Sequence, residues 1–401
     1  MKPAPVIAVL GTYDSKAAEH EFLKQRIMAR GLQAMTINIG TKTPSPVPVA
    51  LDLHPVVREQ LKPAADGRDA AIAAVLAEAR RRIKELYAAG AINGIISAGG
   101  GTGTHLATGV MRALPLGVPK VMVSTVASRN MRTTVGTKDI VMMHSVVDIL
   151  GVNSILGVIL DQAAGAVCAM VQSQWQPSQV KKRIALPFFG FITPAAEAVT
   201  RALETRGYEV VGFHANGTGG MAMVELAAEG YFDGILELAT HELADQLKDG
   251  YCSGIGAERF APIPGRSIPR LVVPGGLDCA VLEFTRATVP QQYQNRKIFF
   301  YDFRSAIRLD HHETATLADQ LADQLNQDPA HIRFLIPSRG WSEPDRADGP
   351  LYDPEMSRVF VNRLRERLSP TIEIHEVDHH INDPEFAEIA AAMMHAMIAA
   401  A

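Results

Sequence analysis

Short, mainly apolar runs alternate with amphipathic stretches over the first 175 residues. The runs lie at residues 6–10, 34–39, 94–98 and 120–125 and predict strands. The first, 6–10, is apolar at every position, which predicts a parallel strand that is buried on both faces. The amphipathic stretch after Asp14 places Ala18, Phe22, Leu23 and Ile27 on one side of a helix that ends at Gly31, and a second helix is predicted over 69–89. Strands that alternate with helices predict a doubly wound sheet.

The same alternation restarts after residue 180, with apolar runs at 183–190, 209–213, 233–238 and 268–274. Thr193-Pro194 predicts a helix start with a capping hydroxyl and a proline in the first turn. We therefore predict α/β architecture with two Rossmann-like doubly wound domains and mainly parallel sheets. They span residues 1–175 and 183–401, and the polar segment 173–182 links them. The repetition indicates duplication of one unit or convergence on it.

Composition limits the class of protein. The chain has 401 residues, of which 47% are hydrophobic and 20% charged, and its net charge is −4. These values are typical of a globular protein and predict no broad attraction to nucleic acid or to anionic membranes. Cys168, Cys252 and Cys279 lie in no metal-ligand spacing and are expected to be free thiols of a reducing compartment. No stretch approaches about 18 uncharged apolar residues, so we expect a cytoplasmic protein without a membrane partner.

The most informative local pattern is the glycine-rich run that follows the strand at 94–98. It consists of Gly99, Gly100, Gly101, Thr102, Gly103 and Thr104. Glycines let a ligand approach the backbone closely, and the N–H groups at a helix start attract anions. The run lacks the lysine of a P-loop and the third glycine of a dinucleotide fingerprint. It predicts a phosphate site, with a tight packing turn as the alternative.

Two other strand ends are expected at the same edge of the sheet, where ligands bind in doubly wound folds. The first carries Gly11, Thr12, Asp14 and Lys16, of which Lys16 could meet a phosphate and Asp14 a magnesium ion or a ribose hydroxyl. Helix capping and a surface lysine explain these residues equally well. The second carries Ser124, Thr125 and Arg129, hydroxyls and a guanidinium that suit a phosphorylated or carboxylated ligand. His144 and Asp148 are expected to form a buried pair.

The second half offers candidates for proton transfer. His214 opens a second glycine-rich turn, 214–220, and has a side chain that titrates near neutral pH. Asp278 follows the strand at 268–274, and His380 and Asp383 lie near the C-terminus. We name His214, Asp278, His380 and Asp383 as candidate catalytic residues. The acidic and histidine-rich stretch 376–384 could bind a divalent metal, but it lacks the helical spacing of zinc enzymes, so no metal site is predicted there.

Longer motifs recur in a fixed order along the chain. They are Gly11-Thr12-x-Asp14-x-Lys16 and the stretches 99–104, 119–125, 135–139, 214–220, 273–278 and 380–384. In this order they resemble the Tm-1-like ATP-binding protein family (UPF0261), whose namesake is a tomato resistance protein. The resemblance implies ATP binding in the first domain, two Rossmann-like subdomains and a tendency to form homodimers, and it implies no settled reaction. Tyr13 and Ser15 depart from the family pattern. So does the stretch 299–308, which puts any shared substrate in doubt.

Three functions are open at this point. The first is an ATP-binding protein, with Mg²⁺ as a candidate companion of ATP, that acts as an enzyme on a small polar or acidic metabolite between the domains. The second is an ATP-independent lyase, hydrolase or isomerase that uses the glycine-rich turns for the phosphate or carboxylate of its own substrate. The third is a nucleotide-regulated binding module without catalysis.

Overall fold

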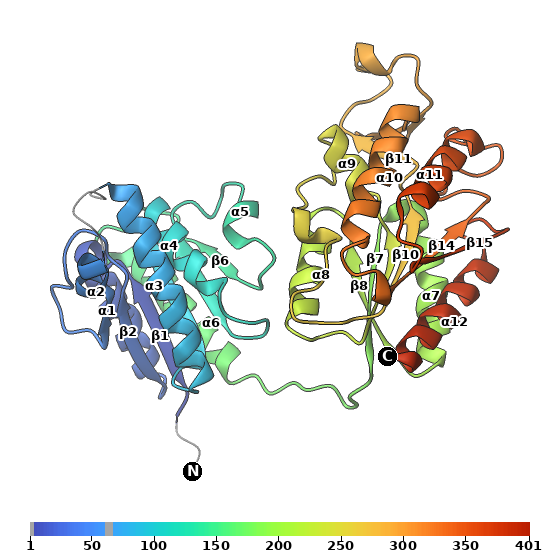
Figure 1. Ribbon diagram of the computed structural model, residues 1–401. Coiled ribbons are helices and arrows are strands. Elements are labelled where there is room, and N and C mark those ends of the chain that lie inside the picture. The colour runs from blue at the N-terminus through green and yellow to red at the C-terminus, as the bar shows by residue number, and fades with distance from the viewer. Residues whose placement is uncertain (1–3, 61–66) are drawn as a thin grey trace. The chain divides into compact units, whose positions relative to one another are not determined.

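The computed structural model describes residues 4–60 and 67–401, and the chain divides into two compact units. Unit 1 is Met1–Gln176 and unit 2 is Pro177–Ala401 (Figure 1). The division falls inside the segment 173–182 that was expected to link two domains.

Unit 1 is built on a parallel sheet of six strands. The strands are β1 (Val6–Gly11), β2 (Gln33–Asn38), β3 (Leu51–Asp52), β4 (Gly94–Gly99), β5 (Lys120–Ser124) and β6 (Val141–His144). Their order in the sheet is β3-β2-β1-β4-β5-β6, and all neighbours run parallel. The chain moves outward from β1 to β3 and then returns to β4 on the other side of β1. The strand order therefore reverses between β1 and β4, which is the place where doubly wound sheets bind ligands.

Helices cover both faces of this sheet (Figure 1). On one face α1 (Tyr13–Met28) and α6 (Ser154–Val171) pack against Ile7 and Val9 of β1. The other face carries α2 (Leu53–Gln60), α3 (Arg68–Ala88) and α4 (Gly101–Met111). There the alternate β1 residues, Ala8 and Leu10, enter the core. The short helix α5 (Arg132–Val135) precedes β6. The apolar runs predicted these central strands because consecutive side chains enter two different cores.

Two expectations for unit 1 were wrong. The stretch 41–68 is rich in proline and has no hydrophobic periodicity, which predicts a long surface loop or flap. It contains β3 and α2 instead, although its residues 61–66 lie outside the described part of the chain. Ala18 is exposed, while Glu19 and His20 of the same helix are buried. Lys16 interrupts α1 with non-helical backbone angles (φ −138°, ψ 38°), so the buried side is rotated from the one that ideal helical spacing predicts.

Unit 2 repeats the plan. Its parallel strands are β7 (Arg183–Phe188), β8 (Glu209–His214), β9 (Gly234–Ala239), β10 (Arg270–Gly275), β14 (Ile332–Pro337) and β15 (Glu373–Val377), in the order β15-β14-β10-β9-β7-β8. Apart from β3 in unit 1 and β15 in unit 2, which have no counterparts, the two paths are the same, and the order reverses between β7 and β9. A separate antiparallel sheet has the order β11-β13-β12, formed by β11 (Cys279–Leu282), β12 (Ile298–Phe300) and β13 (Ser305–Arg308). The apolar pattern did not predict this small sheet.

The helices of unit 2 also form two layers (Figure 1). On one face lie α7 (Thr193–Thr205) and α12 (Pro384–Ala400). On the other lie α8 (Thr218–Ala228), α9 (Glu242–Lys248), α10 (His311–Leu325) and α11 (Pro354–Arg367). Four single-turn helices complete the unit: η1 (Gly190–Ile192), η2 (Ala257–Arg259), η3 (Gln291–Tyr293) and η4 (Pro329–His331). Thr193 is the first residue of α7 rather than its cap, because η1 runs directly into the helix.

One helix among the described residues, α6, has the length and apolar composition of a membrane-crossing segment. Its Leu156, Leu160 and Ala163 are completely buried against the sheet of unit 1. Asp161 of α6 pairs with Arg26 and Arg30. Through these contacts α6 packs against the core of unit 1.

Candidate functional site

The carboxyl ends of β1 and β4 border a cavity of about 220 Å³. Thr12, Asp14 and Lys16 line it from the turn after β1 and the start of α1. The segment Gly100–Gly103 lines it from the turn after β4 and the start of α4. The structure thus brings together two predicted segments that are more than 80 positions apart in the sequence, at the point where the strand order reverses.

Helix α4 begins at this cavity, and the amides of Gly101, Thr102 and Gly103 have no hydrogen-bond partner within the described residues. The start of α1 is more fully bonded, since the amide of Tyr13 donates to the Asn38 side chain at 3.0 Å and the amides of Ser15 and Lys16 donate to the Thr12 carbonyl. Gly100 caps α4 and Thr12 caps α1, and in the described chain neither cap makes a side-chain hydrogen bond to its helix. The first turn of α4 also contains no acidic side chain. The four N–H groups at a helix start lack partners inside the helix and carry a partial positive charge. An anion in the cavity would satisfy these donors.

Charged side chains add to this field. Three cationic residues line the cavity, Lys16, Lys42 and Arg68, together with one carboxylate, Asp14. Arg68 donates a hydrogen bond to the Thr102 hydroxyl at 3.2 Å. Asp14 accepts one from the backbone N–H of Lys42 at 2.9 Å, which holds the segment after β2 against α1. Sequence reasoning missed Lys42 and Arg68, because both lie in the stretch 41–68, which was expected to be a surface loop.

Lys16 has a second contact that orients it. Its ammonium group donates a hydrogen bond to the carbonyl oxygen of Ile149, which follows β6. One of its three N–H donors is therefore used within the protein, and two remain for a ligand. The predicted role of Lys16 as a charge partner is compatible with this position.

The remaining predicted residues of unit 1 support the cavity instead of lining it. Gly11 makes room for a neighbour, since a Cβ on Gly11 would lie 2.3 Å from the His20 ring. A Cβ on Gly99 would lie 3.0 Å from the Gly103 Cα, so Gly99 allows the strand and helix to meet. Thr104 and Ser124 are buried, and their hydroxyls bond to each other at 2.7 Å.

Thr125 and Arg129 lie beside this turn. The amide of Thr125 donates to the Gly99 carbonyl at 3.2 Å, and its side chain is half-buried. Arg129 is exposed and does not line the cavity. The predicted His144–Asp148 pair was wrong: both side chains are exposed, His144 bonds to the Ser124 carbonyl, and Asp148 accepts from the amide of Ile149.

His20 is a buried residue near the site that the sequence did not single out. Its Nδ1 lies 2.7 Å from the carbonyl oxygen of Lys16, and its ring packs 5.1 Å from that of Tyr13. Burial lowers the pKa of His20, so the imidazole is neutral near pH 7. It supports the kinked first turns of α1.

The second glycine-rich turn, 214–220, is filled by the protein itself. Gly217 donates its N–H to the Glu242 carboxylate at 2.7 Å, and Gly219 donates to the Asn216 side chain at 3.1 Å. Glu242 in turn accepts from the buried guanidinium of Arg259 at 2.7 Å. An internal carboxylate, that of Glu242, therefore already occupies this glycine-rich turn, and an anionic ligand would have to displace it.

Of the candidate catalytic residues, Asp278, His380 and Asp383 lie together. Ser342 joins two of them: its hydroxyl donates to Asp278 at 2.8 Å, and its carbonyl oxygen lies 3.0 Å from His380 Nε2. Asp383 accepts from the backbone N–H of His380 at 2.7 Å. The amide of Asn382 donates to His380 Nδ1, so both ring nitrogens have partners inside the protein.

His214 does not join this group. It is exposed at the end of the edge strand β8, and β7 and β9 separate that strand from β10, which precedes Asp278. Three strand spacings amount to about 14 Å, which is far beyond the reach of direct proton transfer. The four candidate catalytic residues therefore do not form one site, because β8 and β10 are not neighbours.

Asp278 shares one arginine with a second buried carboxylate. Arg308 lies 2.8 Å from Asp345 and 3.9 Å from Asp278. Burial, and then the neighbouring Asp278, raise the pKa of Asp345 to about 7. Burial also raises the pKa of Asp278. Two carboxylates with one guanidinium hold a proton at neutral pH more readily than either would in water.

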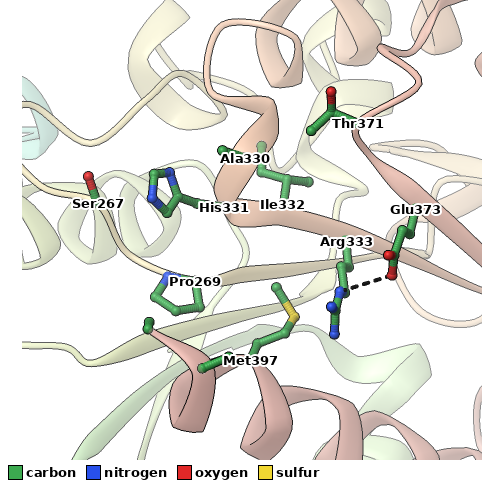
Figure 2. Close-up of a pocket in the computed structure, with 11 residues that line it drawn as sticks. Ser267, Pro269, Ala330, His331, Ile332, Arg333, Thr371, Glu373 and Met397 are labelled. Carbon is green, nitrogen blue, oxygen red and sulfur yellow. Dashed lines mark ion pairs between the residues drawn. The ribbon is translucent and has the colours of Figure 1, made fainter.

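A larger cavity of about 500 Å³ lies elsewhere in unit 2 (Figure 2). Its walls include Pro269, Ile332 and Glu373, at the amino ends of β10, β14 and β15. An ion pair of 3.2 Å joins Arg333 and Glu373 across one side. Ligands of doubly wound sheets bind at the carboxyl ends of strands, so this cavity lies at the opposite edge from the expected site.

Two family models match the chain. The "Uncharacterised protein family (UPF0261) N-terminal domain" matches residues 5–176, and the corresponding C-terminal domain matches residues 181–398. The chain belongs to the UPF0261 family. A UPF0261 protein of Clostridium tetani is 34% identical over 392 residues, 95% of this chain and 96% of that protein. UPF0261 protein RA0729 of Rhizobium meliloti is 34% identical over 396 residues, 96% of this chain and 97% of that protein.

The resemblance to the tomato namesake is also confirmed. The ToMV resistance protein Tm-1(GCR237) of Solanum lycopersicum is 30% identical over 414 residues, which cover 96% of this chain and 54% of that protein. Among solved structures, MurG of Acinetobacter baumannii has a TM-score of 0.24 at 9% identity, covering 99% of this chain and 93% of that one. A TM-score of this size carries no argument about function.

Proposed function

We propose that this UPF0261 protein binds ATP through its phosphates at the cavity between β1 and β4. The observation that carries the proposal is the start of α4, which has no side-chain cap, at the strand-order reversal, with Lys16, Lys42 and Arg68 around it. Backbone N–H groups would bind the phosphate oxygens, and the cations would neutralise their charge.

The size of the cavity supports the same assignment. Sites that enclose small molecules measure about 300–1,000 Å³, and this cavity of about 220 Å³ is smaller. It suits the phosphate chain, and the ribose and base would lie outside it. The same size also favours the second candidate, an enzyme that binds the phosphate of a small metabolite without any nucleotide.

The residues around the cavity fit Mg²⁺, which accompanies ATP in most proteins. Asp14, Thr12 and Thr102 supply oxygen donors, the ligand type that Mg²⁺ prefers. The hydrogen bond from Lys42 uses one carboxylate oxygen of Asp14, and the other has no hydrogen bond within the described segments. Bound there, Mg²⁺ would offset the charge of the phosphates, while Asp14 would fix its position.

Titration calorimetry tests the proposal and separates the candidates. The full chain is titrated with ATP, ADP, AMP-PNP and inorganic triphosphate, with and without Mg²⁺. ATP should bind more tightly than triphosphate, because the ribose and base add contacts outside the cavity. No binding of any nucleotide, with binding of a simple phosphate, would replace the first candidate by the second. Nucleotide binding without turnover of a panel of small acids would favour the regulated binding module.

A pair of lysine variants locates the site. Lys16→Met should weaken ATP binding about 10- to 100-fold, because a hydrogen bond to a charged group contributes about 1.5–3 kcal/mol. Lys24→Met is the matched control, since Lys24 lies on the same helix and pairs with Glu21 at 3.1 Å. An equal loss of ATP affinity in Lys16→Met and Lys24→Met would contradict the assignment of the site.

We also propose that the protein forms a homodimer. Leu150, Ile155 and Val158 expose 85%, 53% and 57% of their surface at and before the start of α6. Neighbouring exposed apolar side chains of this kind are typical of interaction surfaces. Sedimentation analysis should show a dimer that Leu150→Asp dissociates, and a monomer at all concentrations would contradict the proposal.

A further inference from the structure

Three buried side chains of unit 2 converge at the carboxyl end of β9. They are His241, Asp245 and Cys252, and one nitrogen, one oxygen and the sulfur lie within 4.8 Å of one another. His241 and Asp245 are four positions apart at the start of α9, so they share one face of that turn. Cys252 comes from the following turn, and its amide donates to Asp245 at 2.7 Å, which fixes the turn against the helix.

The imidazole is oriented with one nitrogen toward the group. His241 Nε2 lies 2.8 Å from the carbonyl oxygen of Ala215, so Nε2 carries the proton and Nδ1 holds a lone pair. Nδ1 is buried and has no hydrogen-bond partner in residues 4–60 and 67–401. The Phe189 ring stacks on the imidazole with centroids 3.9 Å apart, which limits its rotation. Metal-bound histidines are held in this way, by a hydrogen bond from the other ring nitrogen.

Asp245 has two backbone hydrogen-bond donors, the amides of Cys252 and Val281, each at 2.7 Å, and no lysine or arginine pairs with it within the described residues. The side chain is completely buried, and its one ion-pair contact within the described chain is the 4.0 Å distance to His241 Nδ1. Because His241 donates through Nε2 to Ala215, it presents the Nδ1 lone pair, and not a proton, to the carboxylate. A buried carboxylate without a counter-charge is costly. A divalent cation with one carboxylate and one thiolate would form a neutral set.

We propose that unit 2 binds one Zn²⁺ ion through His241 Nδ1, the Asp245 carboxylate and the Cys252 thiolate. Nitrogen, oxygen and sulfur together are the donor set that zinc accepts, at metal–ligand distances of about 2.0–2.3 Å. If the three ligand atoms moved about 1 Å closer to one another, all three could lie at these distances from one zinc ion. Binding displaces the thiol proton of Cys252 to solvent. Three protein ligands leave a fourth position for water or a substrate, the arrangement of catalytic rather than structural zinc sites.

The location adds to the argument. β9 borders the reversal of strand order in unit 2, the position that corresponds to the proposed phosphate site of unit 1. Residues from the ends of β7, β8 and β9 (Phe189, Ala215 and His241) meet there. The zinc proposal does not depend on nucleotide binding in unit 1.

Cobalt substitution tests the site in the full chain. Protein stripped with a chelator is titrated with Co²⁺, whose thiolate complexes show a charge-transfer band in the near ultraviolet. We expect one Co²⁺ per chain with this band, displacement by Zn²⁺, and loss of the band in Cys252→Ser. Cys279→Ser is the matched control because Cys279 is also a free, completely buried thiol, and Cys168→Ser is a control in unit 1.

Several results would overturn the proposal. Wild-type protein that binds no stoichiometric Co²⁺, or a band that persists in Cys252→Ser, would each do so. If Cys252→Ser does not fold, X-ray absorption of the zinc-loaded wild-type protein decides. A zinc ion with one sulfur ligand and further nitrogen and oxygen ligands supports the site. A zinc ion without a sulfur ligand refutes it. His241→Gln should weaken zinc binding at least 10-fold, and unchanged affinity would contradict the assignment of Nδ1.

Discussion

Replacement of Gly101 by valine tests the phosphate site with little disturbance of the fold. Gly101 is the first residue of α4, and a Cβ at this position would meet no heavy atom within 4 Å. The isopropyl group would therefore stand in open space at the cavity, beside the amides that are proposed to bind phosphate. Valine has a higher helix propensity than glycine, so the free energy of unfolding should change by less than about 1 kcal/mol.

The expected loss of binding follows from the bonds that the side chain would block. A hydrogen bond to a charged oxygen contributes about 1.5–3 kcal/mol, and two such bonds from the first turn contribute at least about 3 kcal/mol. That energy corresponds to an increase of about 100-fold in the dissociation constant of ATP. Inorganic triphosphate should lose a similar factor, because the blocked contacts are to phosphate.

Calorimetric titration of both ligands measures the effect, and circular dichroism confirms that the variant is folded. Gly190→Val is the matched control, since a Cβ on Gly190 in unit 2 would also meet no heavy atom within 4 Å, and Gly190 lies at no proposed nucleotide site. A folded Gly101→Val protein that binds ATP as tightly as the wild type would refute the reasoning. So would equal losses in the two valine variants.

Three further predictions concern stability. Gly99→Ala should lower it by about 1–3 kcal/mol in urea unfolding, because the new Cβ would lie 3.0 Å from the Gly103 Cα; an unchanged midpoint would contradict this packing role. Arg259→Met should cost about 3–5 kcal/mol in guanidinium unfolding, because it leaves buried Glu242 without its cation and buried Glu237 with only the more distant Arg270 at 3.7 Å; a loss below 1 kcal/mol would show that Glu242 needs no counter-charge. Because Asp345 has a pKa of about 7 in the folded protein and about 4 when unfolded, stability should fall by at most about 4 kcal/mol as the pH rises from 4 to 7. Asp278→Asn, which leaves one carboxylate for the shared arginine, should flatten that slope in unfolding measured across pH, and an unchanged slope would assign it to other groups.

Much of the fold could be predicted from the sequence because the central strands are buried on both faces. The run 94–98 is apolar since its side chains enter two cores, and such runs are visible without any partner. The apolar pattern failed to predict the structure where a strand is short or where the backbone of a helix departs from ideal geometry. β3 has two residues, and Lys16 interrupts α1, so neither has a periodic signature.

The candidate site was predictable only in part. Glycine-rich segments at strand ends are local signals, and the structure places Thr12 and Gly100–Gly103 at one cavity. Lys42 and Arg68 reach that cavity through the path of the chain after β2, which no local pattern encodes. The group around Cys252 depends on a contact with the start of α9, although the spacing of His241 and Asp245 was a visible signal.

The most direct test of the central claim is a crystal structure of the full chain with AMP-PNP and Mg²⁺. We expect phosphate oxygens within hydrogen-bond distance of the amides of Gly101–Gly103, Lys16 beside the phosphates, and the adenosine outside the cavity. Phosphates bound at any other edge of either sheet, or at the turn 214–220 of unit 2, would contradict that claim.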